Sequence, residues 1–197
     1  MTYIKIFHKD LNTPYEKIIE IIHDAFKERL EQNLKFSCAN ISIDEYKNKV
    51  KDSFIFVVFD DDNNPIGTSV LTIKKKFGIK YGLFEYLAVS THKKRCGIGK
   101  LLMKECIDFA KKENIDCLTS STADGAVSSV KAHKQNGFKI YMYRSFTCTN
   151  YYSFCFIRPI KKTITISVIL LFRPLLYAVS YILCKVLKDK NGQFSIK

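Results

Sequence analysis

Apolar residues recur along the first 160 residues with two different spacings, and these spacings separate strands from helices. An alternating or β-branched and aromatic pattern predicts seven strands, at residues 3–7, 53–59, 66–73, 81–90, 115–120, 138–143 and 151–157. Apolar residues three and four positions apart predict four helices, at residues 14–31, 42–50, 125–136 and between Gly99 and Lys112. No internal repeat interrupts this order. The pattern therefore predicts one α+β domain over residues 1–160.

Caps and turn residues support several of these boundaries. Pro14 follows Asn12 and Thr13 at the start of the first helix, and Ser42 with Glu45 has the spacing of a capping box. Gly137 follows the fourth helix, where glycine commonly ends a helix. The polar residues 60–65 separate two strands, so we expect a solvated hairpin turn there, and no metal site.

The stretch from Thr91 to Lys104 joins a basic turn, two closely spaced glycines and the start of an amphipathic helix. Gly97 and Gly99 carry no side chain that would block the backbone N–H groups. The first N–H groups of a helix are unpaired and lie at the positive end of its dipole. Because the stretch directly follows a strand, it predicts a binding site for a phosphate-bearing ligand. Glycine pairs also cap ordinary helices, and this motif alone leaves that reading open.

The composition narrows the choice of partner. The chain of 197 residues has a formal net charge of +13, which favours anionic partners. It has no CxxC pair, no RNA-recognition signature and no arginine-rich helix, so we expect phosphate groups or a membrane surface, and no nucleic acid. The seven cysteines are odd in number and lack metal-ligand spacing, which predicts reduced, buried thiols. Together with an N-terminus that has no long apolar run, this predicts a cytoplasmic protein without a signal peptide.

The end of the chain differs from the rest. From Arg158 onward there are eight Lys or Arg and one Asp, a net charge of +7, around a 25-residue apolar run at 163–187. Its length permits a membrane span, but Arg173 at the centre costs about 2.5 to 3.5 kcal/mol and Pro174 interrupts a helix. We therefore expect residues 161–197 to be a basic tail of two short segments, peripheral at the inner face of an anionic membrane. A true span, a helix that covers the core, and an oligomer contact such as a homodimer are the alternatives.

Two motifs resemble those of the GNAT superfamily, the acetyl-CoA-dependent N-acetyltransferases, over roughly residues 3–158. The loop sequence after the strand is similar to the family's acyl-CoA pattern, Q/R-x-x-G-x-G/A, with Lys94 where Gln or Arg is commoner. The resemblance implies a mixed, mostly antiparallel central sheet flanked by helices. It also implies acetyl-CoA as co-substrate, bound mainly through backbone donors, by Leu87, Ala88, Val89, Lys94, Arg95, Cys96, Gly97, Ile98, Gly99 and Lys100.

The second motif precedes Gly137 and Phe138. The family has a tyrosine five residues before this phenylalanine, and His133 stands at that position. The family tyrosine can protonate the departing thiolate, and an imidazole is able to do the same; the other reading is a core histidine with satisfied hydrogen bonds. The family's frequent asparagine is Ala126 here, which removes one anchor for the pantetheine region.

The resemblance implies direct attack of an amine on a thioester, which needs a base. Glu85 is our candidate, because the strand pattern places Glu85, Leu87 and Val89 on one face and family bases occur on this strand. A water relay, or a purely structural Glu85 paired with a lysine across the strands, are the alternatives. Backbone N–H groups of residues 87–89 would bind the oxyanion.

Together these features predict an N-acetyltransferase that transfers an acetyl group from acetyl-CoA to a primary amine. The segment 29–38 and the aromatic residues of 141–151 would line the acceptor groove, or else pack in the core. A small-molecule amine such as an amino sugar suits a membrane-associated enzyme slightly better than a protein N-terminus. The alternative is a non-catalytic acyl-CoA-binding or membrane-tethered interaction module.

Overall fold

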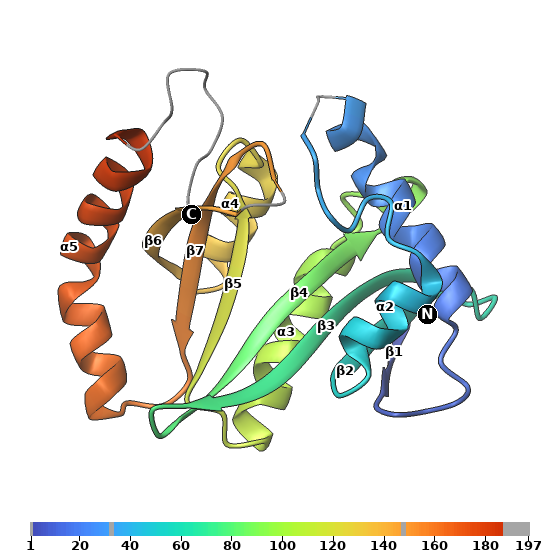
Figure 1. Cartoon of the computed structure of the whole chain (residues 1–197). Coiled ribbons are helices and arrows are strands. Elements are labelled where there is room, and N and C mark those ends of the chain that lie inside the picture. Colours follow the sequence, from blue (N-terminus) through green and yellow to red (C-terminus); the bar gives the residue numbers. More distant parts are fainter. Residues whose placement is uncertain (1, 32–33, 147–148, 187–197) are drawn as a thin grey trace.

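One seven-stranded sheet organises the chain (Figure 1). The computed structural model describes residues 2–31, 34–146 and 149–186. Along the chain the elements are β1 (Tyr3–Phe7), α1 (Tyr15–Glu31), α2 (Ile43–Val50), β2 (Phe54–Phe59), β3 (Pro65–Lys76), β4 (Ile79–Val89), the 3₁₀ turn η1 (Thr91–Lys93), α3 (Ile98–Lys112), β5 (Cys117–Ala123), α4 (Val127–Gln135), β6 (Lys139–Ser145), β7 (Tyr152–Pro159) and α5 (Ile164–Val186). The seven predicted strands and four predicted helices of the domain are all present.

The sheet has the order β1-β2-β3-β4-β5-β7-β6. Neighbouring strands are antiparallel except for β4 and β5, which are parallel. The mixed, mostly antiparallel sheet is therefore confirmed. The parallel pair is short: Tyr81, Gly82 and Leu83 of β4 are paired with β5, and the strands then separate. Figure 1 shows the two strands diverging, so that the sheet is split from its middle to one end.

Helices cover both faces of the sheet and bury two hydrophobic clusters. On one face α3 packs on β2, β3 and β4, with Phe56, Leu71 and Leu102 fully buried between them. On the other face α1 and α2 enclose a second cluster, in which Ile18 and Tyr46 are fully buried. Apolar side chains alternate between the two clusters along β2, which is why this strand has an almost uninterrupted apolar sequence.

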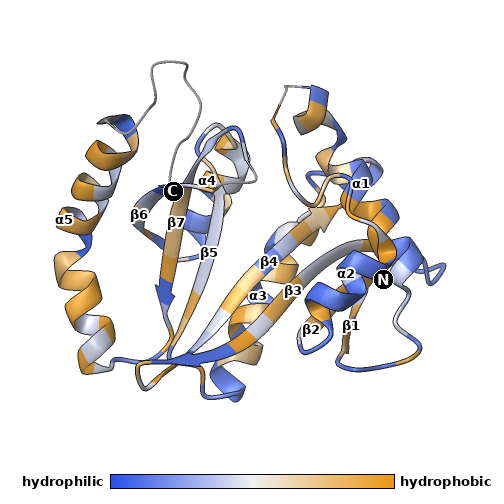
Figure 2. Cartoon of the chain, viewed as in Figure 1, coloured by the Kyte–Doolittle hydropathy of each residue, from blue (hydrophilic) through white to orange (hydrophobic). Residues whose placement is uncertain are grey.

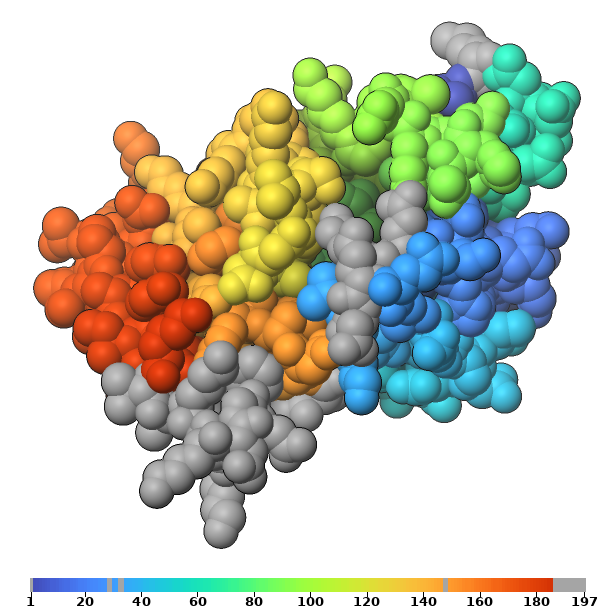
Figure 3. Space-filling model, turned by 90° about the horizontal axis from the view of Figure 1, so that it is seen from above, coloured from blue at the N-terminus to red at the C-terminus, as the bar shows by residue number. Residues whose placement is uncertain are grey.

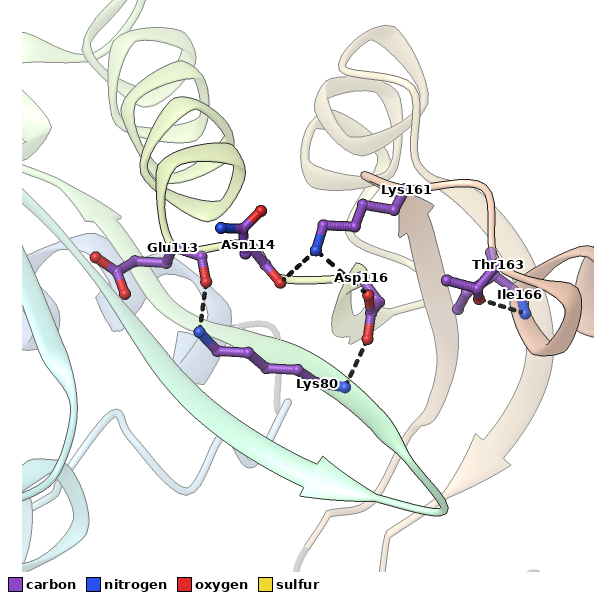
Figure 4. A network of polar contacts seen from close by, with 7 residues as sticks. All are labelled: Lys80, Glu113, Asn114, Asp116, Lys161, Thr163 and Ile166. Carbon is purple, nitrogen blue, oxygen red and sulfur yellow. Dashed lines mark hydrogen bonds and ion pairs between the residues drawn. The ribbon is translucent and has the colours of Figure 1, made fainter.

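A polar network closes the joined end of the split (Figure 4). The Lys80 N–H donates to the Asp116 carboxylate (2.7 Å), and the Asp116 N–H donates to the Lys80 carbonyl (2.7 Å). The Lys80 ammonium donates to the Glu113 carbonyl, and the Lys161 ammonium donates to the Asn114 carbonyl (3.0 Å). The network ties β4 to the chain segments that lead into β5 and out of β7. It therefore holds the two halves of the sheet together where the strand pairing is shortest.

The last helix corrects one expectation from the sequence. Residues Ile164–Val186 form one continuous helix that contains Pro174, so the prediction of two short segments is wrong. The helix runs along the free edge of β6, where Arg173 donates to the Ile140 carbonyl (3.3 Å) and Ser180 accepts from the Tyr143 N–H (2.9 Å). This packing offsets the backbone hydrogen bond that proline removes, and it covers an edge strand that would otherwise expose unpaired groups.

Candidate active site

The loop between β4 and α3 presents a row of unpaired backbone donors. Gly97 begins α3 with φ = 80°, and Arg95 also has a positive φ of 65°. The first helical hydrogen bond of α3 runs from the Leu101 N–H to the Gly97 carbonyl (2.9 Å). Within the described part of the chain, the N–H groups of residues 95–100 have no hydrogen-bond acceptor. The predicted cofactor-binding residues of this loop therefore lie together at a helix N-terminus, with the geometry that binds phosphate.

The two glycines serve this loop in different ways. A side chain at Gly97 would meet no atom within 4 Å, but its φ of 80° is a conformation that only glycine adopts without strain. At Gly99 the nearest atom to an added Cβ is the Val89 Cγ2, at 3.8 Å. Neither glycine is needed for packing, so the space above both is open to a ligand.

Asp24 of α1 anchors the start of this loop. Its carboxylate accepts a hydrogen bond from the Thr91 N–H (2.7 Å), and the Ser90 hydroxyl lies 3.5 Å away. The Thr91 N–H bond lowers the pKa of Asp24, and the nearby His92 and Lys94 act in the same direction. The sequence did not indicate this contact, because Asp24 lies on a helix distant in sequence from the loop.

A recess of about 520 Å³ lies on the outer side of the loop. Cys96, Gly97 and Ile98 form one wall, and the acidic turn 60–62 forms another. A phosphate in this recess would face carboxylates, so the acidic wall suits neutral or cationic groups better. Among the described residues no three His, Cys, Asp or Glu side chains are placed to bind a metal ion.

A β-bulge in β4 overturns the predicted orientation of Glu85. Thr68 of β3 is opposite Ala88 and Val70 is opposite Glu85, so Tyr86 and Leu87 together face one residue of β3. Tyr86 has φ = 52°, and its ring packs on the α1 and α2 side while Leu87 packs on the α3 side. The prediction that Glu85, Leu87 and Val89 share one face is therefore wrong, because the extra residue reverses the alternation.

Glu85 lies on the α1 and α2 side of the sheet, next to Cys38 and Tyr86. Its side chain reaches solvent, but the dense surroundings desolvate the carboxylate and raise its pKa. Lys74 and Lys49 oppose this shift. A carboxylate with a raised pKa and solvent access is suited to accept a proton near neutral pH.

His133 is buried on the opposite side of the sheet, with 3% of its surface exposed. Its Nδ1 lies 2.8 Å from the Ser129 carbonyl and must donate to it, so Nε2, at 3.0 Å from the Ser120 hydroxyl, accepts. The ring stacks on Phe156 with the centroids 4.6 Å apart. Burial lowers the pKa of His133 and favours this neutral form. These are the contacts of a core histidine, and they identify Ser120 as a neighbour that the sequence did not indicate.

The split in the sheet lies between these two candidates. Glu85 lies two residues after Leu83, the last residue of β4 that pairs with β5, and Ser120 directly follows Thr119, the matching residue of β5. The structure therefore does not bring Glu85 and His133 into contact. It places them on opposite faces, each at the point where the two strands separate. Beyond this point β4 is paired only with β3 among the described residues, so its other edge presents free backbone groups to the split.

Two predicted acceptor segments meet at the open end of the split. The Phe36 ring packs against the Tyr151 ring in a tilted arrangement with the centroids 4.6 Å apart, and the Lys35 N–H donates to the Asn150 side chain (2.8 Å). Figure 3 looks down on this end and shows the blue α1–α2 connection beside the orange start of β7. Residues 32–33 and 147–148 of the same predictions lie outside the described residues, and so do the side chains at 28–29.

The aromatic residues of β6 have a different role. Tyr141 packs with Ile166 and Leu170 of α5, and the Tyr143 ring lies 5.1 Å from the Tyr181 ring. These tyrosines therefore bind α5 to the sheet, in line with the packing alternative considered for them. The six described cysteines are free thiols; burial raises the pKa of Cys106 to about 12 and that of Cys117 and Cys155 to about 11.

Comparison with known proteins gives the same fold. The chain is similar to the ribosomal-protein-S18-alanine N-acetyltransferase from Escherichia coli (14% identity, 83% of this chain and 96% of that chain, TM-score 0.63). It is also similar to an N-acetyltransferase from Staphylococcus aureus Mu50 (14%, 81% and 98%, 0.64). A third neighbour is a GNAT family acetyltransferase from Elizabethkingia anophelis with acetyl-CoA bound (17%, 80% and 97%, 0.55). At these identities the likeness shows the fold alone.

Sequence comparison identifies the family. No curated protein sequence matches the chain. The model of the acetyltransferase (GNAT) family matches residues 15–138, which include the glycine loop and end at the phenylalanine of the His133 motif. The match covers more than half of the 197 residues. Together with the split sheet and the donor-lined loop, it establishes that this chain belongs to the GNAT acetyltransferase family.

Proposed function

We propose that this GNAT protein is an N-acetyltransferase that transfers an acetyl group from acetyl-CoA to a primary amine. The observation that carries the proposal is the row of unpaired N–H groups at residues 95–100, beside a sheet that is split at the end of the same strand. The loop supplies donors for a pyrophosphate, and the split supplies free backbone groups for an extended chain and its thioester. GNAT enzymes use acetyl-CoA, and the open space at Gly97 and Gly99 fits such a ligand.

In this proposal Glu85 is the base. The amine nitrogen attacks the thioester carbonyl carbon. The C–S bond then breaks, the CoA thiolate departs, and the acetyl group stays bonded to the nitrogen. Glu85 takes up the proton that the substrate ammonium loses before the attack, directly or through one water, and the nitrogen releases its second proton to solvent as the C–S bond breaks. The raised pKa and solvent access of its carboxylate support this role. Backbone N–H groups of residues 87–89, around the bulge, bind the oxyanion.

His133 is the proposed source of the proton that the departing thiolate takes up. Because its Nε2 contacts the Ser120 hydroxyl, the proton passes from the imidazolium to Ser120 and from Ser120 to sulfur. The lowered pKa of His133 makes the imidazolium a minor form at neutral pH, so His133 has to take up a proton before it can donate one in each turnover. If His133 only packs the core, its replacement will leave the turnover number and pH profile unchanged.

The acceptor is proposed by chemical class only. Phe36 of the α1–α2 connection and Tyr151 before β7 are in contact at the open end of the split, and their rings suit an amine on an apolar or ring-shaped body. A small-molecule amine, such as an amino sugar, is our first choice. The second candidate function is a non-catalytic acyl-CoA-binding module, which the core-like contacts of His133 favour.

Thiol release separates the two functions. The protein is incubated with acetyl-CoA and a panel of amines that contains amino sugars, polyamines and peptides with a free N-terminus. We expect free CoA thiol and N-acetylated product to form in equal amounts with at least one amine. Binding of acetyl-CoA with no thiol release above the rate without protein, for any amine of the panel, would favour the non-catalytic module.

A further inference from the structure

Helix α5 has two opposite faces, each with its own composition. At 100° per residue, the side chains that contact the sheet form one stripe: Ile166, Leu170, Arg173, Tyr177, Ser180 and Cys184. A second stripe, which we call the outer stripe, lies half a turn away at Ile164, Val168, Leu171, Leu175, Val179 and Ile182. Its side chains are exposed by 85%, 47%, 73%, 60%, 47% and 58%.

The outer stripe contains no charged side chain. The helix has no acidic residue, and its two basic residues within 164–185 are Arg173 and Lys185. Arg173 is turned toward the Ile140 carbonyl, away from the outer stripe. Figure 2 shows α5 coloured mostly as apolar along its length, whereas α1, α2 and α3 alternate between apolar and hydrophilic positions. A continuous apolar surface of this kind on a folded domain marks an interaction site.

We propose that the outer stripe of α5 binds the surface of an anionic lipid bilayer, with the helix lying in the plane of the interface. Ile164–Lys185 is long and apolar enough to cross a bilayer, with a mean hydropathy of 2.0. One face, however, is bonded to β6 at Ile140 and Tyr143, and Tyr152 donates to the Cys184 carbonyl (2.7 Å). A span would draw these strand edges into hydrocarbon or break their bonds to the helix. An in-plane helix keeps every one of these contacts.

The charges around the stripe select lipid over a second copy of the chain. Lys162 precedes α5, Lys185 lies in its last turn, and the sequence continues with Lys188 and Lys190. Lysines at both ends attract the phosphates of anionic headgroups. Two copies of the helix would place lysines against lysines in either the parallel or the antiparallel orientation. The stripe is also wider than the narrow seam of a paired helix, because Phe172 and Leu183 extend it to one side with 52% and 51% exposure.

Vesicle binding tests the proposal with the full-length protein. We expect the chain to sediment with vesicles of phosphatidylcholine and phosphatidylglycerol, less with phosphatidylcholine alone, and less at high salt. The double variant Leu171→Gln with Leu175→Gln should bind about tenfold more weakly, because each buried leucine contributes a large part of the apolar attraction. The matched control, Leu11→Gln with Phe77→Gln, removes two side chains that are 99% and 86% exposed elsewhere and should bind like the wild type.

Three results would overturn the proposal. The first is a wild type that binds no vesicles, or an outer-stripe variant that keeps its fold and binds equally well. The second result concerns the depth of α5 in the bilayer. Because the chain has no tryptophan, replacing Val168, Leu175 or Ile182 by tryptophan, one at a time, gives a single fluorophore whose quenching by brominated lipid reports its depth. Equal quenching is expected, whereas deepest quenching at 175 would indicate a span. The third is a lipid-free dimer that the Leu171→Gln, Leu175→Gln variant dissociates, together with no vesicle binding, which would assign the stripe to a second copy.

Discussion

Glu85 and His133 have shifted pKa values for the same physical reason, which is loss of water around the ionised form. Burial raises the pKa of the Glu85 carboxyl and lowers that of the His133 imidazole, so both neutral forms gain population. The two residues differ in their access to solvent. Glu85 reaches solvent, whereas His133 is enclosed by three phenylalanine rings, those of Phe84, Phe138 and Phe156. Direct contact with an amine is therefore open to Glu85 alone.

The Glu85→Gln variant tests the base. We expect kcat/KM to fall by about 10²- to 10⁴-fold while acetyl-CoA affinity is unchanged. In the wild type, activity should fall as the pH drops through a pKa above the ordinary value of 4.5, because only the carboxylate accepts a proton. Lys74→Gln is the companion variant: Lys74 lowers the pKa of Glu85, so its loss should move this acid limb to higher pH. Wild-type turnover and pH profile in Glu85→Gln would exclude Glu85 as the base.

His133 makes the stability of the protein depend on pH. Its pKa is below 6.5 in the folded state and about 6.5 in the unfolded chain, so the unfolded chain binds more protons between these values. The free energy of unfolding should therefore fall as the pH drops below 6.5, by up to about 1.4 kcal/mol per pH unit, and be independent of this group above 6.5. His133→Phe should lack this dependence. Urea denaturation at several pH values measures it, and equal slopes in both proteins would contradict the assignment.

At the scale of elements, periodicity and caps were enough to predict the strands and helices of the domain. The Ser42 hydroxyl accepts from the Glu45 N–H (3.2 Å), as the capping-box spacing predicted, and Gly137 has φ = 78° after α4. The bulge at Tyr86 was missed, because period-two reasoning assumes one residue opposite one residue. No turn residue marks the bulge in the sequence, since Tyr86 adopts its positive φ inside an apolar strand.

The continuity of α5 was missed for a related reason. Proline costs an isolated helix about 3 kcal/mol, and the sequence offered no sign of what would offset it. In the structure β6 supplies partners on both sides of Pro174, through Arg173 and Ser180. Long-range contacts of this kind, like the bond from Thr91 to Asp24, depend on the assembled fold and not on local sequence.

At the scale of the whole molecule, the candidate binding surfaces lie at three separate places: the glycine loop, the split in the sheet and the outer stripe of α5. The loop at residues 95–100 presents unpaired N–H groups that suit an anion, the split lies between Glu85 and His133, and the outer stripe of α5 faces away from the sheet. The row of N–H donors was predictable, because its glycines and basic residues are contiguous in sequence. The segments 29–38 and 141–151 were also named from the sequence as acceptor candidates, but the contact between Phe36 and Tyr151 was not, because it forms only when two distant connections fold together.

The most direct test of this account is calorimetric titration of acetyl-CoA into the wild type and the Gly97→Glu variant. We expect the wild type to bind and the variant to show no binding, because the new carboxylate repels phosphate at the row of N–H donors. Gly78→Glu is the matched control: it adds the same charge at φ = 73°, with no atom within 4 Å, in the β3–β4 turn. It should bind acetyl-CoA like the wild type. Equal affinity in Gly97→Glu and the wild type would contradict the assignment of this loop to the acetyl donor.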